Sequence, residues 1–167
     1  LGEASKSIQV GGADFLVICT NTMHKVAPQI ETAIDIPILH IADATAEQMV
    51  EDGIKAVGLL GTAFTMEQDF YKKRVEDKYK IEVLVPNQPD RAIVHDIIYQ
   101  ELCLGKVEGD SREQYLRIIE DLSSSGAEAV ILGCTEIALL VNSTQTSVKL
   151  YDTTQIHAQK AVEWALS

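Results

Sequence analysis

The sequence predicts an α/β fold, a two-lobed α/β/α sandwich with parallel sheets. Short apolar runs alternate with longer segments of helical polar and apolar spacing along all 167 residues. The runs are apolar throughout, as in residues 56–60, which is typical of parallel strands covered on both faces. Hydrophobic residues form 46% of the chain, enough for a packed core.

The first part of the chain is expected to hold three strands. In order, we expect the end of a helix in 1–11, strands in 15–19, 38–41 and 55–60, a helix in 22–34, and a helix from Asp43 or Thr45 to about 52. Thr22 is a suitable N-cap for the 22–34 helix, and Pro28 implies a kink or an early irregular turn within it. Glycines at 11, 12 and 53 supply helix stops.

The rest of the chain continues the alternation. We expect helices in 67–80, 89–104 and 111–125, strands in 81–85, 127–132 and 148–151, a helical turn up to 140, and a last helix that begins after Asp152 and runs to 166. These elements divide into a partial first lobe in 1–50, a second lobe in 51–150, and a C-terminal helix in 151–167 that returns to the first lobe.

The composition of the chain excludes some classes of binding partner. The net charge of -11 argues against a nucleic-acid or anionic-membrane surface. Three cysteines without regular spacing indicate reduced thiols and a cytoplasmic protein, and no motif for zinc or a dinucleotide is present. The apolar runs are too short to cross a bilayer.

Two strand ends carry groups suited to chemistry. The first reads Cys19-Thr20-Asn21-Thr22-Met23-His24, and the second reads Leu132-Gly133-Cys134-Thr135-Glu136. Each follows a short apolar strand and precedes a helical pattern, so it presents small polar side chains at the carboxyl end of a strand. The repetition of this arrangement predicts one site to which both ends contribute.

Taken together, these two segments resemble the aspartate/glutamate racemase family, most of all its bacterial amino-acid racemase branch, and the similarity runs through nearly the whole chain. The resemblance implies that the protein racemises an acidic amino acid without pyridoxal phosphate or another cofactor, using two thiols on opposite faces of the α carbon. It also implies a homodimer. The family has an opening strand, a glycine-rich loop, a helix and a second strand before this region, so we expect the first lobe to be incomplete.

The first motif departs from the family pattern. The family reads Cys-Asn-Thr, and aligning Asn21 and Thr22 places Thr20 where the first catalytic thiol is expected. Adjacent side chains on a strand point to opposite faces, so Cys19 is expected to face the core or a helix. A hydroxyl is a much weaker proton acceptor than a thiol. We therefore expect unequal forward and reverse rates, or a reaction that uses one thiol.

Cys134 is the main candidate for an acid/base group. At a strand-to-helix junction its thiol is expected to have a lowered pKa, although a free cysteine is often simply buried. Thr135 either donates a hydrogen bond to the substrate or caps the helix. Glu136 either tunes the thiol, binds the substrate ammonium, or is an ordinary first-turn carboxylate.

The remaining candidates are anion-binding or structural. Asn21, Thr22 and Thr62, with Thr65 as a weaker member, follow strands and suit a carboxylate, although N-capping and turn formation also explain such residues. The other polar residues are interpreted as structural: His24 on a helix surface or interface, His40 in a strand, His95 in a helix, Lys25 as surface charge and Cys103 as helix packing.

Two alternative functions remain open from the sequence. A decarboxylase or isomerase of the same superfamily, such as a malonate decarboxylase or maleate isomerase, suits a site with a single thiol. A non-catalytic carboxylate-binding protein would retain the pocket without a competent base pair. The sequence does not distinguish aspartate from glutamate as substrate.

Overall fold

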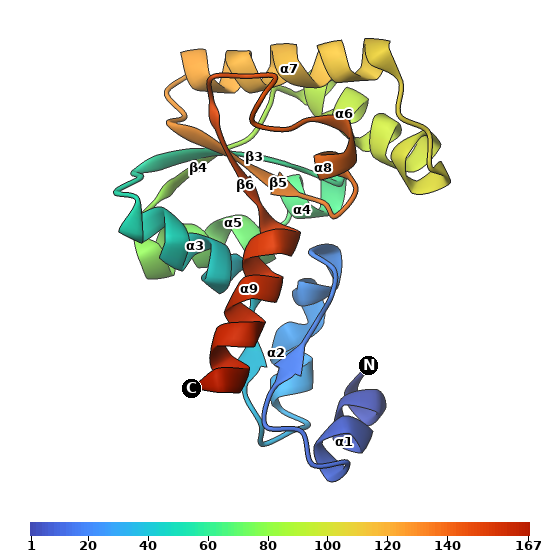
Figure 1. The fold of residues 1–167 in the computed structure, drawn as a ribbon, viewed down its shortest axis with the longest axis vertical. Coiled ribbons are helices and arrows are strands. Elements are labelled where there is room, and N and C mark those ends of the chain that lie inside the picture. Colours follow the sequence, from blue (N-terminus) through green and yellow to red (C-terminus); the bar gives the residue numbers. More distant parts are fainter.

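The structure is a computed structural model that describes residues 1–167. It contains two separate parallel sheets joined by helices (Figure 1). The strands are β1 (Leu16–Val17), β2 (Ile38–Leu39), β3 (Ala56–Gly61), β4 (Glu82–Leu84), β5 (Ala129–Gly133) and β6 (Lys149–Asp152). The helices are α1 (Gly2–Val10), α2 (Ala27–Glu31), α3 (Ile41–Glu51), α4 (Ala63–Glu67), α5 (Asp69–Tyr79), α6 (Gln88–Gln100), α7 (Gly109–Ser124), α8 (Ile137–Leu140) and α9 (Thr153–Leu166), with 3-10 turns η1 (Thr22–Val26) and η2 (Leu102–Leu104). The predicted α/β class with parallel sheets is confirmed.

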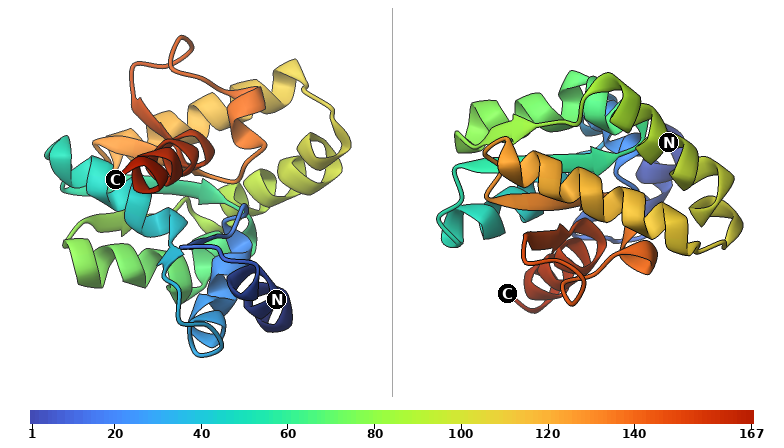
Figure 2. Two further views of the ribbon diagram at one scale, coloured as in Figure 1. Left: turned by 60° about the horizontal axis from the view of Figure 1, so that its bottom comes forward. Right: turned by 90° about the horizontal axis from the view of Figure 1, so that it is seen from above.

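The larger sheet has the strand order β4-β3-β5-β6 and is covered on both faces (Figure 2). Side chains alternate across it: Ala129 and Ile131 of β5 pack with α3 and α5, while Val130 and Leu132 pack with α6 and α7. Both sets are buried, which explains why the strand sequence is apolar throughout. Burial of each large aliphatic side chain contributes about 1.5–3 kcal/mol.

The smaller sheet, β1 with β2, lies beside α9 (Figure 1). Its own core is small and includes Leu16 and Ile30. The Phe15 and Trp164 rings pack edge to face, with centroids 5.5 Å apart. Nε2 of His157 on α9 lies 2.8 Å from the Leu39 carbonyl oxygen. The last helix therefore connects the two sheets. The lobe limits 1–50, 51–150 and 151–167 stay a prediction.

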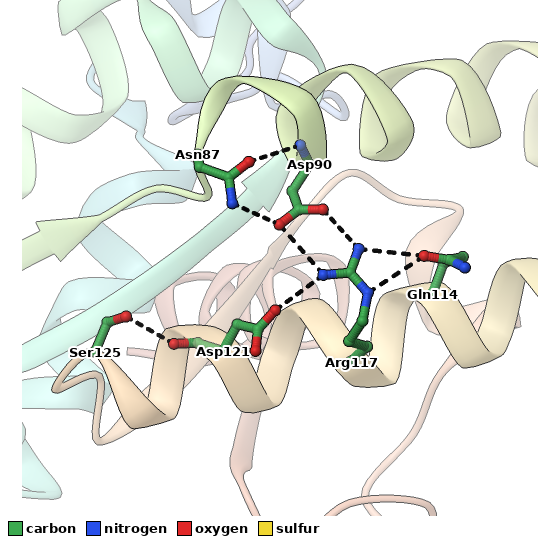
Figure 3. A network of polar contacts seen from close by, with 6 residues as sticks. All are labelled: Asn87, Asp90, Gln114, Arg117, Asp121 and Ser125. Carbon is green, nitrogen blue, oxygen red and sulfur yellow. Dashed lines mark hydrogen bonds and ion pairs between the residues drawn. The ribbon is translucent and has the colours of Figure 1, made fainter.

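A polar network fixes α6 against α7 (Figure 3). Arg117 donates to Asp90 at 2.6 Å and to Asp121 at 2.9 Å. The Asp90 carboxyl is buried, and its hydrogen bonds from Arg117 lower its pKa. The Tyr115 hydroxyl donates to the Val94 carbonyl at 3.0 Å, which adds a second link between these helices. These contacts join α6 to α7 at the N-terminal end and the middle of α6.

The helix predicted in 22–34 ends early, at Glu31, and the early irregular turn that Pro28 implied is confirmed as η1. The α-helix α2 follows η1, because Pro28 lies in the first turn of α2, where its fixed φ favours a helix start. Thr22 is not an N-cap; its hydroxyl faces other threonines across the site. The strand predicted in 38–41 ends early, at Leu39, so the prediction that His40 lies in a strand is wrong. His40 is the N-cap of α3, its Nδ1 accepting from the Ala42 N–H at 3.2 Å.

The caps of α3 and the 67–80 helix also differ from expectation. Asp43 pairs with Arg74 at 2.7 Å, and Thr45 donates back to the Ile41 carbonyl, so neither caps α3. The helix predicted in 67–80 is interrupted near its start. Glu67 is the last residue of α4, Gln68 is extended, and α5 begins at Asp69. Asp152 caps α9 as predicted, accepting from the Thr154 N–H at 2.9 Å. No helix combines the length and apolar character that a membrane crossing requires.

Candidate functional site

A cavity of about 280 Å³ lies at the carboxyl ends of β3 and β5, next to the segment that follows β1. Its lining residues come from both sheets and from the end of α6. They are Thr20, Asn21, Thr22, Met23, Thr62, Ile98, Tyr99, Cys103, Gly133, Cys134, Thr135 and Glu136. All seven site residues predicted from the sequence are among them. The two motifs therefore meet at one cavity, while the roles of their residues stay predictions.

His24 holds the backbone at Thr20. The Ile41 N–H donates to His24 Nε2 at 3.2 Å, so the proton of the neutral ring is on Nδ1, which donates to the Thr20 carbonyl at 2.8 Å. His24 is buried, and this burial lowers its pKa to about 4. Of the two predicted settings for His24, a helix surface or an interface, the surface is wrong, because η1 turns this residue inward against Ile41. The half-buried Thr20 side chain is presented to the cavity from a backbone that is fixed in place.

Asn21 joins the first motif to the second sheet. Its Nδ2 donates to Thr153 Oγ1 at 3.0 Å, and the Thr153 hydroxyl donates to the Leu132 carbonyl at 2.9 Å. This chain of donors fixes the orientation of the Asn21 amide. Asn21 Oδ1 is left buried without a hydrogen-bond partner. An acceptor of this kind is uncommon in a folded protein, and it suits a ligand that can donate hydrogen bonds.

Three threonine hydroxyls gather on one side of the site. Thr22 Oγ1 lies 3.1 Å from Thr62 Oγ1 and 3.4 Å from Thr65 Oγ1, and the latter two are 3.3 Å apart. Thr62 and Thr65 are buried, and Thr62 also caps α4. The capping interpretation therefore holds for Thr62, although its hydroxyl also belongs to the cluster. Hydroxyl groups so close together can turn their hydrogens toward one carboxylate.

The thiol of Cys134 faces a carboxylate. Its Sγ donates to Glu136 Oε2 at 3.0 Å, and the Thr135 hydroxyl donates to the same oxygen at 2.7 Å. Burial, followed by the hydrogen bond to Glu136, raises the pKa of the Cys134 thiol to about 12. The expectation of a lowered pKa is wrong. The helix that follows begins only at residue 137 and has four residues, so its dipole is small, while the adjacent carboxylate disfavours a thiolate.

Gly133 allows the second motif to approach β3. A Cβ at this position would lie 2.8 Å from the Leu60 carbonyl oxygen, closer than any side chain tolerates. The ends of β3 and β5 can therefore come together only with glycine here. This approach brings Thr62 after β3 and Cys134 after β5 to the same cavity.

Two expectations about the other cysteines are wrong. Cys19 is exposed rather than turned to the core or a helix, because β1 ends at Val17 and strand alternation no longer applies. Cys103 is exposed and lines the cavity rather than packing inside, because α6 ends at Gln100 and gives way to η2. Partial desolvation at the cavity wall raises the pKa of the Cys103 thiol, and the charge of Glu136 adds to that effect.

The sequence interpretation missed the wall of the cavity that α6 provides. Ile98, Tyr99 and Cys103 line it, together with Met23 from η1. The spacing of four between Tyr99 and Cys103 was the only available signal, since side chains four apart share a helix face. Among the lining residues Glu136 is the one carboxylate, and none is Lys, Arg or His.

Comparison with known proteins agrees with this arrangement. The family model for the Asp/Glu/hydantoin racemases matches residues 1–161. A crystal structure of a Yersinia pestis protein proposed to be an Asp/Glu racemase is 51% identical, with a TM-score of 0.95 over 99% of this chain and 72% of that one. An aspartate racemase homologue from Pyrococcus horikoshii is 36% identical, with a TM-score of 0.89 over 100% of this chain and 73% of that one.

A curated relative extends the comparison to a protein with a named activity. The broad specificity amino-acid racemase RacX of Bacillus subtilis is 22% identical over 99% of this chain and 70% of its own length. The match of the family model covers nearly the whole sequence, including both motifs at the cavity. The chain belongs to the Asp/Glu/hydantoin racemase family.

Proposed function

We propose that the protein racemises an acidic amino acid, aspartate or glutamate, without a cofactor, with Cys134 and Thr20 acting on opposite faces of the α carbon. The observation that carries this proposal is that both residues line one cavity although they follow strands of different sheets. Groups delivered from two sheets can flank a small ligand. Names of the relatives, an aspartate racemase homologue and an amino-acid racemase, support the same class of reaction.

The α-carboxylate of the substrate binds at the threonine cluster in this proposal. Thr22, which follows β1, and Thr62, which follows β3, supply hydroxyl donors on the same side of the cavity, 3.1 Å apart. The α-ammonium binds at Glu136 and at the unpaired Oδ1 of Asn21, which are acceptors without a nearby cation. These contacts hold the α carbon between the two motifs and stabilise the negative charge that develops when its proton leaves.

The thiol of Cys134 must lose its proton before it can act as a base. Glu136 Oε2, 3.0 Å from Sγ, is positioned to receive that proton. The resulting thiolate removes the α-hydrogen, and the Thr20 hydroxyl donates its proton to the carbanion from the other face. The proton held by Glu136 then passes to solvent while solvent reprotonates Thr20, so both groups return to their starting states. The electron pair of the C–H bond passes to the carbanion and then to the new C–H bond.

The two directions of this reaction are expected to differ in turnover number, with a matching difference in KM, because the equilibrium constant of racemisation is one. A hydroxyl gives a proton readily to a carbanion, but as an alkoxide base it is far harder to prepare than a thiolate. The enantiomer whose α-hydrogen faces Cys134 is therefore converted faster than its mirror image. We also propose, on the resemblance to the family, that the protein assembles as a homodimer and acts in the cytoplasm.

Exchange of the α-hydrogen for deuterium tests the proposed function. The protein incubated in D₂O with each enantiomer of aspartate and glutamate is expected to incorporate deuterium into at least one of them. The Cys134→Ser variant loses the exchange, while Cys19→Ser, which changes an exposed thiol outside the cavity, retains it.

The two alternatives give different results in this experiment. A decarboxylase of the same superfamily would release carbon dioxide from a malonate and leave aspartate unchanged. A non-catalytic protein would bind the amino acid, as calorimetry would detect, without any exchange. Either outcome would contradict the racemase proposal.

A further inference from the structure

We propose that Tyr99 donates a hydrogen bond to the side-chain carboxylate of the substrate and thereby selects acidic over amide side chains. The inference deepens the proposed function and depends on it. It assigns a role to the wall that α6 contributes, where Tyr99 lines the cavity near its mouth.

The arrangement of the cavity leaves this wall for the side chain of the substrate. The threonine cluster and Asn21 occupy the part formed after β1 and β3, and Cys134 with Glu136 occupies the part formed after β5. Thr20 and Thr135 belong to the same two motifs, so the functional side chains that line the third part are those of Tyr99 and Cys103, from α6 and η2. A ligand whose α carbon is held by the first two parts extends its side chain toward the third.

The chemistry of the cavity requires a donor at this position. The lining residues include one carboxylate, Glu136, and no cationic side chain. A second carboxylate on the ligand must therefore be stabilised by neutral donors and kept away from Glu136. A phenol is a strong neutral donor, whereas the thiol of Cys103 is a weak one. The Tyr99 hydroxyl makes no hydrogen bond within the chain, and 44% of the residue is exposed, so the donor is free for a ligand.

Contacts behind Tyr99 hold its ring in place. The His95 ring packs against it with the centroids 4.7 Å apart and an interplanar angle of 50°. His95 Nδ1 accepts from the Ala63 N–H at 3.1 Å, directly after Thr62 in the sequence. The ring is thereby connected to the start of α4, which carries Thr62 and Thr65 of the threonine cluster. A donor held at a fixed position relative to Thr62 favours substrates whose two carboxylates have a matching separation.

The Tyr99→Phe variant of the full chain tests this role, with Tyr79→Phe as the matched control. Tyr79 lies on α5 outside the cavity, so its substitution removes the same hydroxyl without touching the site. We expect Tyr99→Phe to lower kcat/KM for aspartate or glutamate about tenfold, since hydrogen bonds to charged groups are among the stronger ones. Affinity for the acidic amino acid, measured by calorimetry, is expected to fall by a similar factor. Affinity for asparagine and glutamine is expected to change by less than about twofold.

An equal fall for acidic and amide ligands, or no change for either, would overturn the role of Tyr99. The control variant should leave all of these values unchanged, and the thermal unfolding midpoint of Tyr99→Phe should match that of the unchanged protein, because the hydroxyl has no partner to lose. The proposed function fails separately if the unchanged protein exchanges no α-hydrogen. In that case the calorimetric comparison of acids with amides still decides whether Tyr99 recognises a carboxylate.

Discussion

The hydroxyl oxygens of Thr22 and Thr62 lie 3.1 Å apart. Thr22 follows β1 of the smaller sheet, and Thr62 follows β3 of the larger one. The contact therefore joins the two sheets at the cavity. Each sheet contributes one of the two hydroxyl donors, so the pair forms only when the sheets are packed together. The relative position of the sheets, and not only the residues on each, determines what the site can bind.

Replacing Thr22 by valine tests the proposed carboxylate site. The change keeps the shape of the side chain and removes its hydroxyl, so one donor to a charged group is lost, a contribution of about 1.5–3 kcal/mol. We expect KM for the acidic amino acid to rise about tenfold or more in steady-state assays, with a smaller change in kcat. Thr32→Val is the control, because Thr32 is exposed and donates only to the Gln29 carbonyl. A KM that stays unchanged in Thr22→Val would contradict the assignment.

The Glu136→Gln variant tests the cause of the raised thiol pKa. Glutamine can still accept the hydrogen bond from Cys134 but carries no charge, so the pKa of the thiol, now about 12, is expected to fall. The rate of alkylation by iodoacetamide as a function of pH measures this, in a background where Cys19 and Cys103 are replaced by serine. Faster alkylation near neutral pH is expected. A pH profile that matches the parent would show that Glu136 does not set the pKa.

Thr20→Cys tests the origin of the directional preference. A thiol at this position can act as a base in both directions, so the slower direction is expected to accelerate by at least about tenfold while the faster one changes little. Initial rates from each enantiomer, followed by polarimetry, give the two turnover numbers. Thr20→Ser keeps a hydroxyl and should preserve the inequality. Equal turnover numbers in the unchanged protein would already refute this explanation.

The free energy of unfolding in mild acid tests whether His24 and His40 are buried in their neutral forms. Burial lowers the pKa of His24 from 6.5 to about 4 and that of His40 to about 3. Between pH 6.5 and 4 the unfolded chain binds a proton at His24 that the folded chain does not. Stability is therefore full above pH 6.5 and falls as the pH is lowered toward 4. At about 1.4 kcal/mol for each pH unit, His24 alone accounts for a loss of about 3 kcal/mol.

Urea unfolding at a series of pH values measures this loss. The His24→Gln variant, which removes one of the two titrating rings, is expected to be less stable at neutral pH but to depend less steeply on pH. A free energy of unfolding that stays constant from pH 6.5 to 4 in the parent would contradict the burial of neutral histidines.

Sequence patterns predicted the strands and the meeting of the two motifs because these depend on local rules. A fully apolar run such as residues 129–132 indicates a strand buried on both faces, and the carboxyl ends of parallel strands lie at one edge. Asp152 is predicted as an N-cap and is one in the structure, because N-capping depends only on the first residues of the same helix. These features do not depend on how the sheets pack.

Features that depend on tertiary contacts were not predictable in the same way. The orientation of His24 follows from the Ile41 N–H, which comes from another element. The pKa of Cys134 is governed by burial and by a carboxylate two residues away whose direction the sequence does not specify. Tyr99 lines the cavity from α6, a helix whose position depends on packing against α7, including the contacts of Arg117 and Tyr115.

A crystal structure with an acidic amino acid bound in the cavity tests the central claim most directly. The account predicts that Cys134 Sγ and Thr20 Oγ1 lie on opposite sides of the α carbon, each within about 3–4 Å of it. A ligand bound with both atoms on one side of its α carbon, or bound outside the cavity altogether, would contradict the account.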